Sequence, residues 1–314
     1  MLIELLLSPI ILFFVLGFVA KLLKSNLTIP EQVSKTLSLY LMMAIGFKGG
    51  VGMAQAGFSF LLLKTIGIGV LAGVLIPIIA FYILGKITRL DRVNQASIAA
   101  HYGSISVVTF VAATEYLAHV SMVFDPFLIA IVAVMEVPAI IVGLWLAQEK
   151  GDEKSKIDFR EVFLNGSIVL LVGSLFVGML TGPAGLAAVS PFLVVPFKGV
   201  LCFFLLNMGL IAAQNLKSAK QLNFRLVLFG LTMPLIGATV GLLFSMLIGL
   251  SVGSTVLIMT LCGSASYIAV PAALRISLPE ANLAYPLSLS LGVTFPFNLI
   301  AGIPLYYFVA LLLI

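Results

Sequence analysis

The sequence predicts an all-α, polytopic membrane protein with about ten transmembrane helices. Of its 314 residues, 61% are apolar and only 9% are charged, whereas an ordinary soluble domain is roughly 25% charged. The mean hydropathy is +1.23. The apolar residues form continuous runs of about 20, the length that a helix needs to cross the hydrocarbon core, and they lack the alternation of a transmembrane β-barrel. The ten runs lie at about 5–23, 29–47, 58–85, 94–117, 126–148, 161–180, 190–213, 224–250, 254–275 and 283–312.

Basic residues are concentrated in alternate loops between these runs. The odd-numbered connections carry 14 of the 17 lysines and arginines, and only Lys48, Lys64 and Lys198 fall on the even-numbered side. Cytoplasmic loops are enriched in basic residues, so this bias predicts cytoplasmic odd loops, both termini outside, and an inner (cytoplasmic) membrane protein. The same bias accounts for the net charge of +5, so nucleic-acid binding is not indicated.

A polar segment at the midpoint of the chain divides the runs into two sets of five. We expect a first repeat at 1–148 (helices 1–5), a cytoplasmic linker at 149–160 and a second repeat at 161–314 (helices 6–10). Because five is odd, the second set enters the membrane with opposite polarity to the first. This is the inverted-repeat design of many secondary transporters.

The clearest internal similarity joins runs four and nine. YGSISVVTFVAA (102–113) and CGSASYIAVPAA (262–273) share five identical residues at a constant offset of 160 positions. The identical pairs are Gly103/Gly263, Ser104/Ser264, Ser106/Ser266, Ala112/Ala272 and Ala113/Ala273. We therefore interpret the two halves as inverted repeats.

The paired GSxS segments are expected to interrupt crossing helices 4 and 9. In an intact helix two serines two positions apart would point about 200° apart, so an unwound segment is needed for both to face one ligand. Half-helix N-termini offer free N–H groups to a small anion, and serine hydroxyls and carbonyls can ligate sodium. The candidate substrate-binding residues are Gly103, Ser104, Ser106, Thr109, Gly263, Ser264 and Ser266. The alternative is that glycine and serine only let helices pack closely.

Two further polar residues lie inside apolar runs. Glu136 sits near the middle of run five, where a carboxylate costs on the order of 2.5 to 3.5 kcal/mol, and Asn298 lies at the matching position of run ten. Neither has a basic partner within its own run, so sodium or a proton is the expected counter-charge. Candidate sodium ligands are Glu136, Asn298, Ser106 and Ser266.

Other polar residues admit structural explanations as well as functional ones. His101 could relay protons or simply be hydrogen-bonded, and Lys48 and Lys198 could attract anions or reach the lipid headgroups. Cys202 and Cys262 lack metal-site or redox spacing. No nucleotide-binding loop or metalloprotease motif is present, so the sequence does not predict an enzyme or an organic cofactor.

Several motifs in order along the chain resemble the sodium-dependent bicarbonate transporter family, the SbtA-like permeases. They are IPEQ (29–32), IGFKGG (45–50), GxxSxxT at Gly103, Ser106 and Thr109, MEVPA (135–139), and PxxLRxxxPxAN from Pro271 to Asn282. The resemblance implies ten helices, a core domain against a gate domain, elevator-like movement and a trimer. It also implies sodium-coupled uptake of bicarbonate bound between helices 4 and 9.

The chain departs from the family pattern at two places. Tyr267 replaces an acidic residue directly after the second serine pair, and the linker is far shorter than the cytoplasmic loop of regulated members. Sodium stoichiometry and a PII-like regulatory partner are therefore left open. The expected function is a sodium-coupled symporter of bicarbonate or a similar small anion. The alternatives are a transporter of the same architecture for an organic anion, a cation/proton exchanger, and a membrane enzyme or receptor.

Overall fold

A computed structural model describes residues 8–57, 59–148, 166–218 and 222–314, and every regular element in these ranges is helical. The first half contains α2 (Pro9–Leu22), α3 (Glu31–Ala56), α4 (Phe60–Ile87), α5 (Arg92–Gly103), α6 (Val107–His119) and α7 (Leu128–Ala147). The second contains α9 (Gly166–Leu193), α10 (Phe197–Ser218), α11 (Phe224–Ile248), α12 (Val252–Cys262), α13 (Ala269–Ser277), α14 (Ala284–Leu289), α15 (Phe295–Phe297) and α16 (Ile303–Leu313). The expected linker at 149–160 lies outside the described residues.

Apolar helices account for all ten expected runs. Within the described ranges, seven helices are long and apolar enough to cross a membrane, and they correspond to runs two, three, four, six, seven, eight and ten. Shorter apolar helical segments fall in runs one, five and nine: Pro9–Leu22 (α2), Val134–Ala147 (part of α7) and Val252–Cys262 (α12). The regular structure of the described ranges is thus all-helical, and its apolar helices indicate a multi-pass membrane protein.

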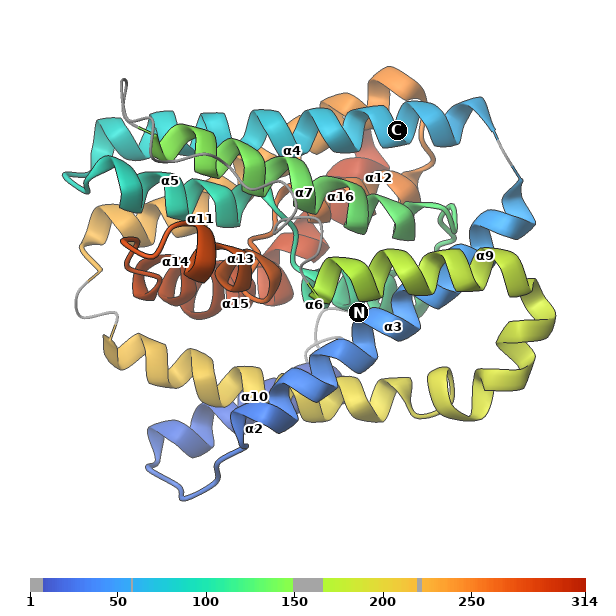
Figure 1. The fold of residues 1–314 in the computed structure, drawn as a ribbon, viewed down its shortest axis with the longest axis horizontal. Helices are drawn as coiled ribbons and strands as arrows, with labels where there is room; N and C mark the ends of the chain where they lie inside the picture. Colours follow the sequence, from blue (N-terminus) through green and yellow to red (C-terminus); the bar gives the residue numbers. More distant parts are fainter. Residues whose placement is uncertain (1–7, 58, 149–165, 219–221) are drawn as a thin grey trace.

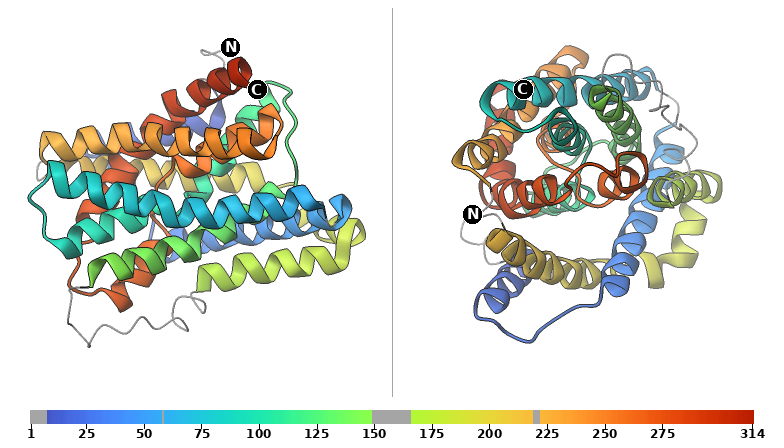
Figure 2. Two further views of the ribbon diagram at one scale, coloured as in Figure 1. Left: turned by 90° about the horizontal axis from the view of Figure 1, so that it is seen from above. Right: turned by 60° about the vertical axis from the view of Figure 1, so that its left-hand side comes forward.

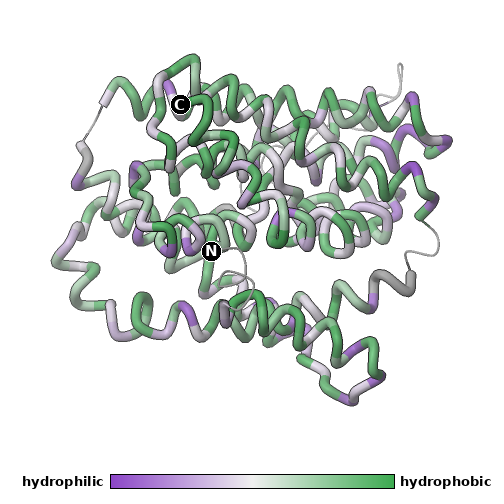
Figure 3. Tube along the Cα trace, turned by 180° about the vertical axis from the view of Figure 1, so that it is seen from behind, coloured by the Kyte–Doolittle hydropathy of each residue, from purple (hydrophilic) through white to green (hydrophobic). Residues whose placement is uncertain are grey.

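Large apolar side chains cover the outside of the molecule. Leu180, Leu247 and Val195 are 86%, 79% and 76% exposed, and Figure 3 shows hydrophobic residues along the lengths of the outer helices. Water would not favour this surface, but lipid tails would cover it without cost. The outer surface is therefore suited to lipid, and the polar side chains that the sequence predicts to bind a ligand lie in the interior.

The helices gather into two bodies (Figures 1 and 2). We call α2, α3, α9 and α10 the first body, and the remaining helices the second body. In the first body α3 packs on α9 and α2 packs on α10, while in the second α4 packs on α5 and α7, and α11 packs on α12. Contacts between the bodies are sparser than contacts within them.

Glycines allow the close pairing inside the first body. A Cβ atom at Gly46 of α3 would overlap the Leu171 carbonyl of α9, and one at Gly209 of α10 would overlap the Phe14 carbonyl of α2. Small residues at such crossings bring membrane helices into van der Waals contact.

The helix boundaries differ from expectation near the start of run seven. α9 continues to Leu193 after a sharp bend at Gly182, whose φ of +58° is a left-handed value that glycine adopts without strain. Run seven was expected to begin at 190, but α10 begins at Phe197. The bend and the following Pro183 separate the two stretches of α9.

Run ten is also irregular. Two π-helical turns, η2 (Ser290–Thr294) and η3 (Asn298–Gly302), interrupt it around Pro296 and Pro304. Proline removes a backbone donor, and π-turns often mark functional sites. The second turn begins at Asn298, so the polar residue of this run lies at an irregular point of its helix.

Candidate functional site

The first GSxS segment interrupts run four as the sequence predicts. α5 ends at Gly103, Ser104 is extended, and Ser106 is the N-cap of α6. The hydroxyl oxygen of Ser106 accepts hydrogen bonds from the backbone N–H and the hydroxyl of Thr109, at 3.1 and 2.8 Å. The positive end of α6 therefore begins in the protein interior.

The second GSxS segment interrupts run nine in the same way. α12 ends at Cys262, and α13 does not begin until Ala269. Pro271 lies in the first turn of α13, where its missing N–H is tolerated. The Ser264 hydroxyl donates to the Leu261 carbonyl, at 2.9 Å, across the end of α12.

Both glycines of these segments serve packing. Neither Gly103 nor Gly263 has a positive φ, so neither break uses a left-handed backbone conformation at its glycine. A Cβ atom at Gly103 would overlap the ring of Pro77, and one at Gly263 would come within 2.7 Å of the Pro234 carbonyl. Each glycine thus lets a broken segment lie against a neighbouring helix.

The two interrupted segments contact each other directly. The Ser106 N–H donates to the hydroxyl oxygen of Ser264 at 2.9 Å, and the Ser266 N–H donates to the His101 carbonyl at 2.7 Å. All four residues are buried. The serines from the two halves therefore form one continuous polar region.

A small cavity lies at this meeting point and receives side chains from both segments. Its volume is about 10 Å³, roughly the space for one water-sized particle, which also suits a desolvated sodium ion. Ser106, Ser266 and Glu136 line it, together with Met42 of the first body and Tyr267. Glu136 is 1% exposed, and its carboxylate forms no hydrogen bond or ion pair within the described ranges. The cavity combines a lone carboxylate with two hydroxyls.

The remaining candidates do not line this cavity. Asn298 donates from Nδ2 to the Gly263 carbonyl and accepts from the Tyr306 hydroxyl, both at 2.8 Å. The Ser104 hydroxyl is buried and has no hydrogen-bond partner among the described residues. Thr109 lies in the first turn of α6, and its hydroxyl donates a hydrogen bond to the Ser106 hydroxyl oxygen. Asn298 therefore supports the second break through Gly263.

His101 is held by its own helix. Its Nδ1 lies 2.7 Å from the Ser97 carbonyl, which can only accept, so Nδ1 carries a proton and donates. Its Nε2 is buried without a partner in the described part of the chain.

Four residues of this region were not among the candidate site residues that the sequence predicted. Met42 and Tyr267 line the cavity; the position of Tyr267 directly after GSxS was a signal, whereas nothing distinguishes Met42 within its apolar run. Tyr102 donates to the Thr294 hydroxyl at 2.6 Å, since that hydroxyl itself donates to the Gly230 carbonyl at 2.7 Å. This chain of bonds fixes the end of α5 against α11 and η2.

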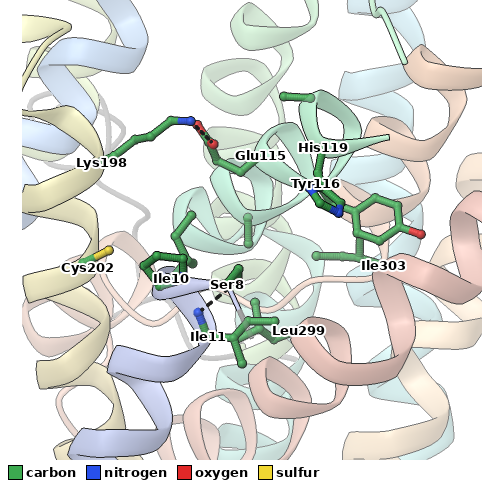
Figure 4. A pocket seen from close by; sticks show the side chains of 13 residues that line it. Ser8, Ile10, Ile11, Glu115, Tyr116, His119, Lys198, Cys202, Leu299 and Ile303 are labelled. Atoms are coloured by element: carbon green, nitrogen blue, oxygen red, sulfur yellow. Dashed lines mark hydrogen bonds and ion pairs between the residues drawn. The ribbon is translucent and has the colours of Figure 1, made fainter. Parts of the chain in front are cut away.

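A second pocket, of about 420 Å³, lies between the two bodies near the end of α6 (Figure 4). Lys198 of α10 forms an ion pair there with Glu115 of α6, with Nζ and Oε2 2.8 Å apart. His119 and Cys202 also line the pocket. Lys48 lies outside it, with Nζ 5.2 Å from the centre of the Phe197 ring.

Comparison with known proteins identifies the family. The family model of the Na+-dependent bicarbonate transporter superfamily matches residues 9–311, almost the whole chain. No curated protein matches the chain in a sequence search. The family consists of transporters rather than enzymes, and the match confirms the resemblance seen in the sequence motifs. The chain therefore belongs to the Na+-dependent bicarbonate transporter superfamily.

Proposed function

We propose that this protein takes up bicarbonate, or a similar small anion, together with sodium, and that the two GSxS segments form the binding site. The observation that carries the proposal is the shared cavity of Ser106, Ser266 and Glu136. A buried, unpaired carboxylate in a membrane is costly and calls for a cation, and oxygen-rich sites of one-ion size suit sodium. Ser106, Ser266 and Glu136 are its proposed ligands, while Asn298 contributes by holding the Gly263 carbonyl.

The anion would bind beside the sodium ion, at the helix ends. The N-terminus of α6 begins at Ser106, and α13 begins three residues after Ser266, whose hydroxyl oxygen lies 3.5 Å from the Val270 N–H. Both helices present the positive ends of their dipoles to an anion. A cavity of about 10 Å³ is too small for sodium and bicarbonate together, so binding of both requires the bodies to separate locally.

An architecture of two inverted halves, 1–148 and 161–314, agrees with the helix pairing. In two inverted halves, α2 corresponds to α9, α3 to α10, α4 to α11 and α5 to α12. The packing of α3 on α9 then corresponds to the packing of α10 on α2, and that of α4 on α5 corresponds to that of α11 on α12. All four of these helix pairs are in contact. The N-caps of α5 and α12, Asp91 and Ser251, are 160 positions apart, the same offset as the GSxS segments.

Transport would proceed by movement of the second body, which carries both breaks, along the first. Two clefts between the bodies support this mechanism: the pocket of Figure 4, and a cleft of about 430 Å³ between α3, α10 and α13 that reaches Tyr267. Each would give access to the site from one side. The distribution of basic residues favours a cytoplasmic location for the second cleft, with the linker cytoplasmic and both termini outside in the inner membrane.

Uptake of labelled bicarbonate into proteoliposomes tests the proposal directly. Uptake should require an inward sodium gradient and should accompany sodium entry. Uptake of an organic anion in preference to bicarbonate, or sodium flux coupled only to proton counterflow, would instead support the alternative functions. Mass measurement of the purified protein in lipid nanodiscs tests the trimer that the family resemblance implies, and lipids bound to the exposed apolar helices are expected there.

A further inference from the structure

The cleft between α3 and α13 carries a row of polar side chains that the proposed site does not use. Glu31, Ser34, Lys35 and Ser38 are spaced at i, i+3, i+4 and i+7 on α3, so they share one face of that helix, and all four line the cleft. Arg275 of α13 lines it from the other body.

The charges in this cleft are unpaired. In the pocket of Figure 4 the lysine of the first body, Lys198, is neutralised by Glu115 of the second. In the α3–α13 cleft the second body instead contributes Arg275, and no ion pair joins Glu31, Lys35 or Arg275 within the described ranges. Two cations and one carboxylate leave a net positive charge, which favours an anion.

Two serine hydroxyls in the cleft can serve as donors to such an anion. Ser38 is 5% exposed, and its hydroxyl has no hydrogen-bond partner in the described part of the chain. The Ser34 hydroxyl oxygen accepts from Asn207 Nδ2 at 2.6 Å, which leaves the Ser34 O–H free to donate. A buried hydroxyl without a partner is costly, so a ligand in the cleft would satisfy it.

We propose that this cleft is a second anion site, in which Lys35, Ser38 and Arg275 bind a small, hydrated oxyanion. The volume of about 430 Å³ exceeds the needs of one bicarbonate and leaves room for its water. Resting on the proposed function, the site would hold the transported anion on its way between the GSxS segments and the aqueous phase. A different cellular oxyanion, such as phosphate, would be recognised by the same groups.

Protection of a reporter cysteine tests the site on the full chain. Leu39 lines the cleft, so Leu39→Cys, with Cys202 and Cys262 changed to serine, reports its occupancy through the rate of reaction with a neutral maleimide. Sodium bicarbonate and, separately, sodium phosphate should slow the reaction at fixed pH and ionic strength. Val123→Cys, 81% exposed in the loop between α6 and α7 and outside the cleft, is the matched reporter that neither anion should protect.

The charge variants give effects of opposite sign. Lys35→Gln and Arg275→Gln should each raise, by about two- to fivefold, the phosphate concentration that halves the maleimide reaction rate, because an exposed ion pair contributes an energy of that size. Glu31→Gln should lower this concentration, because it removes a negative charge. All three residues are exposed, so folding should be unaffected. Equal protection in wild type and in the Lys35 and Arg275 variants, or no protection by either anion, would overturn the proposal.

Two results separate this site from the proposed function. Protection should persist when Ser106 and Ser266 are both alanine, because the cleft does not depend on the central cavity. Protection by phosphate without any bicarbonate transport would leave the cleft site standing and reject the proposed function. Protection by bicarbonate alone identifies a site for the transported anion, and protection by both anions identifies a general oxyanion site.

Discussion

The backbone N–H of Ser106 donates a hydrogen bond to the hydroxyl oxygen of Ser264, 2.9 Å away, across 158 residues of sequence. This bond joins the start of α6 in one half to the end of α12 in the other. Because both groups are buried, each interrupted segment depends on the other for the satisfaction of its polar groups. The two breaks therefore form one structural unit.

Replacement of Ser264 should destabilise that unit. Ser264→Ala leaves the buried Ser106 N–H without an acceptor, which costs about 1 to 3 kcal/mol. Ser104→Ala is the matched control, because its hydroxyl has no partner among the described residues to lose. Thermal unfolding in detergent should therefore show a clear loss for Ser264→Ala and almost none for Ser104→Ala. Equal losses would mean that the bond contributes nothing specific.

Ser106 and Ser266 should contribute to one ligand site. If both bind the same ions, Ser106→Ala and Ser266→Ala should each weaken apparent affinity about tenfold or more, since a hydrogen bond to a charged group is worth roughly 1.5 to 3 kcal/mol. The double variant should lose less than the sum of the single losses in free energy. Transport kinetics in proteoliposomes give these affinities.

Ser106→Ala needs a correction for folding. It also removes the N-cap of α6, worth about 1 kcal/mol, whereas Ser106→Gly removes the same hydroxyl at a smaller cost in capping. The two variants should agree in affinity and differ in stability. Wild-type affinity in folded, active Ser106→Gly and Ser266→Ala proteins would reject the shared site.

Glu136→Gln should abolish the stabilisation of the protein by sodium. Sodium that binds only the folded protein raises its stability by about 2.7 kcal/mol at a hundred times the dissociation constant, and the neutral amide should bind it poorly. The melting temperature of wild type should rise with sodium at constant ionic strength, and that of Glu136→Gln should not. Glu115→Gln, at the distant carboxylate, should keep the wild-type response. A full sodium response in Glu136→Gln would assign Glu136 to structure alone.

The positions of the breaks were predictable from the sequence because small and polar residues are conspicuous in apolar runs. Gly103, Ser104 and Ser106 stand out in run four without knowledge of the fold. Their partners were not predictable in this way. The bond from Ser106 to Ser264 and the contact of Gly103 with Pro77 depend on how distant helices cross, and periodicity carries no information about that.

The cavity was predictable only in part. Glu136 was identified because a carboxylate in an apolar run is costly, and the structure places it beside two of the predicted serines. Met42 carries no polar atom that could distinguish it from its apolar neighbours. Asn298 was identified by the same polarity argument as Glu136, but its amide is occupied by Gly263 and Tyr306, which only tertiary structure reveals.

Acid should destabilise the start of α5 through Asp91. The Asn94 N–H donates to Asp91 Oδ1 at 2.8 Å, and this bond holds the pKa of the Asp91 carboxyl below its ordinary value. The folded pKa is therefore below the unfolded pKa of about 3.9, so the stabilisation is complete above that pH and is lost as the pH falls through the folded pKa. Asparagine caps helices as well as aspartate but does not titrate.

A comparison of melting temperatures between pH 7 and about pH 3 tests this role of Asp91. The melting temperature of wild type should exceed that of Asp91→Asn at neutral pH, and this difference in melting temperature should disappear below about pH 4. Asp91→Ala loses the helix cap at every pH, so it should be about 1 kcal/mol less stable than Asp91→Asn over the whole pH range. A gap between wild type and Asp91→Asn that stays constant over the whole range would contradict the assignment.

The ion pair of Lys198 and Glu115 should hold the two bodies together at the pocket of Figure 4. The lysine side chain is 70% exposed, so the pair should contribute only about 0.2 to 1 kcal/mol to global stability. The same energy applied to an equilibrium between closed and separated bodies changes the open population by up to about fivefold. Neutralising either residue should therefore affect access to the pocket more visibly than folding.

The native cysteines report this opening. Cys202 is partly buried and lines the pocket, whereas Cys262 is buried in α12 and provides an unreactive reference. Glu115→Gln and Lys198→Gln should each raise the rate at which a maleimide modifies Cys202, by up to about fivefold. Exchange of the two charges in Glu115→Lys with Lys198→Glu should restore the slow rate, because the attraction returns with reversed sign. A Cys202 rate that is unchanged in the single variants, or that the charge exchange fails to restore, would mean that apolar contacts alone close the pocket.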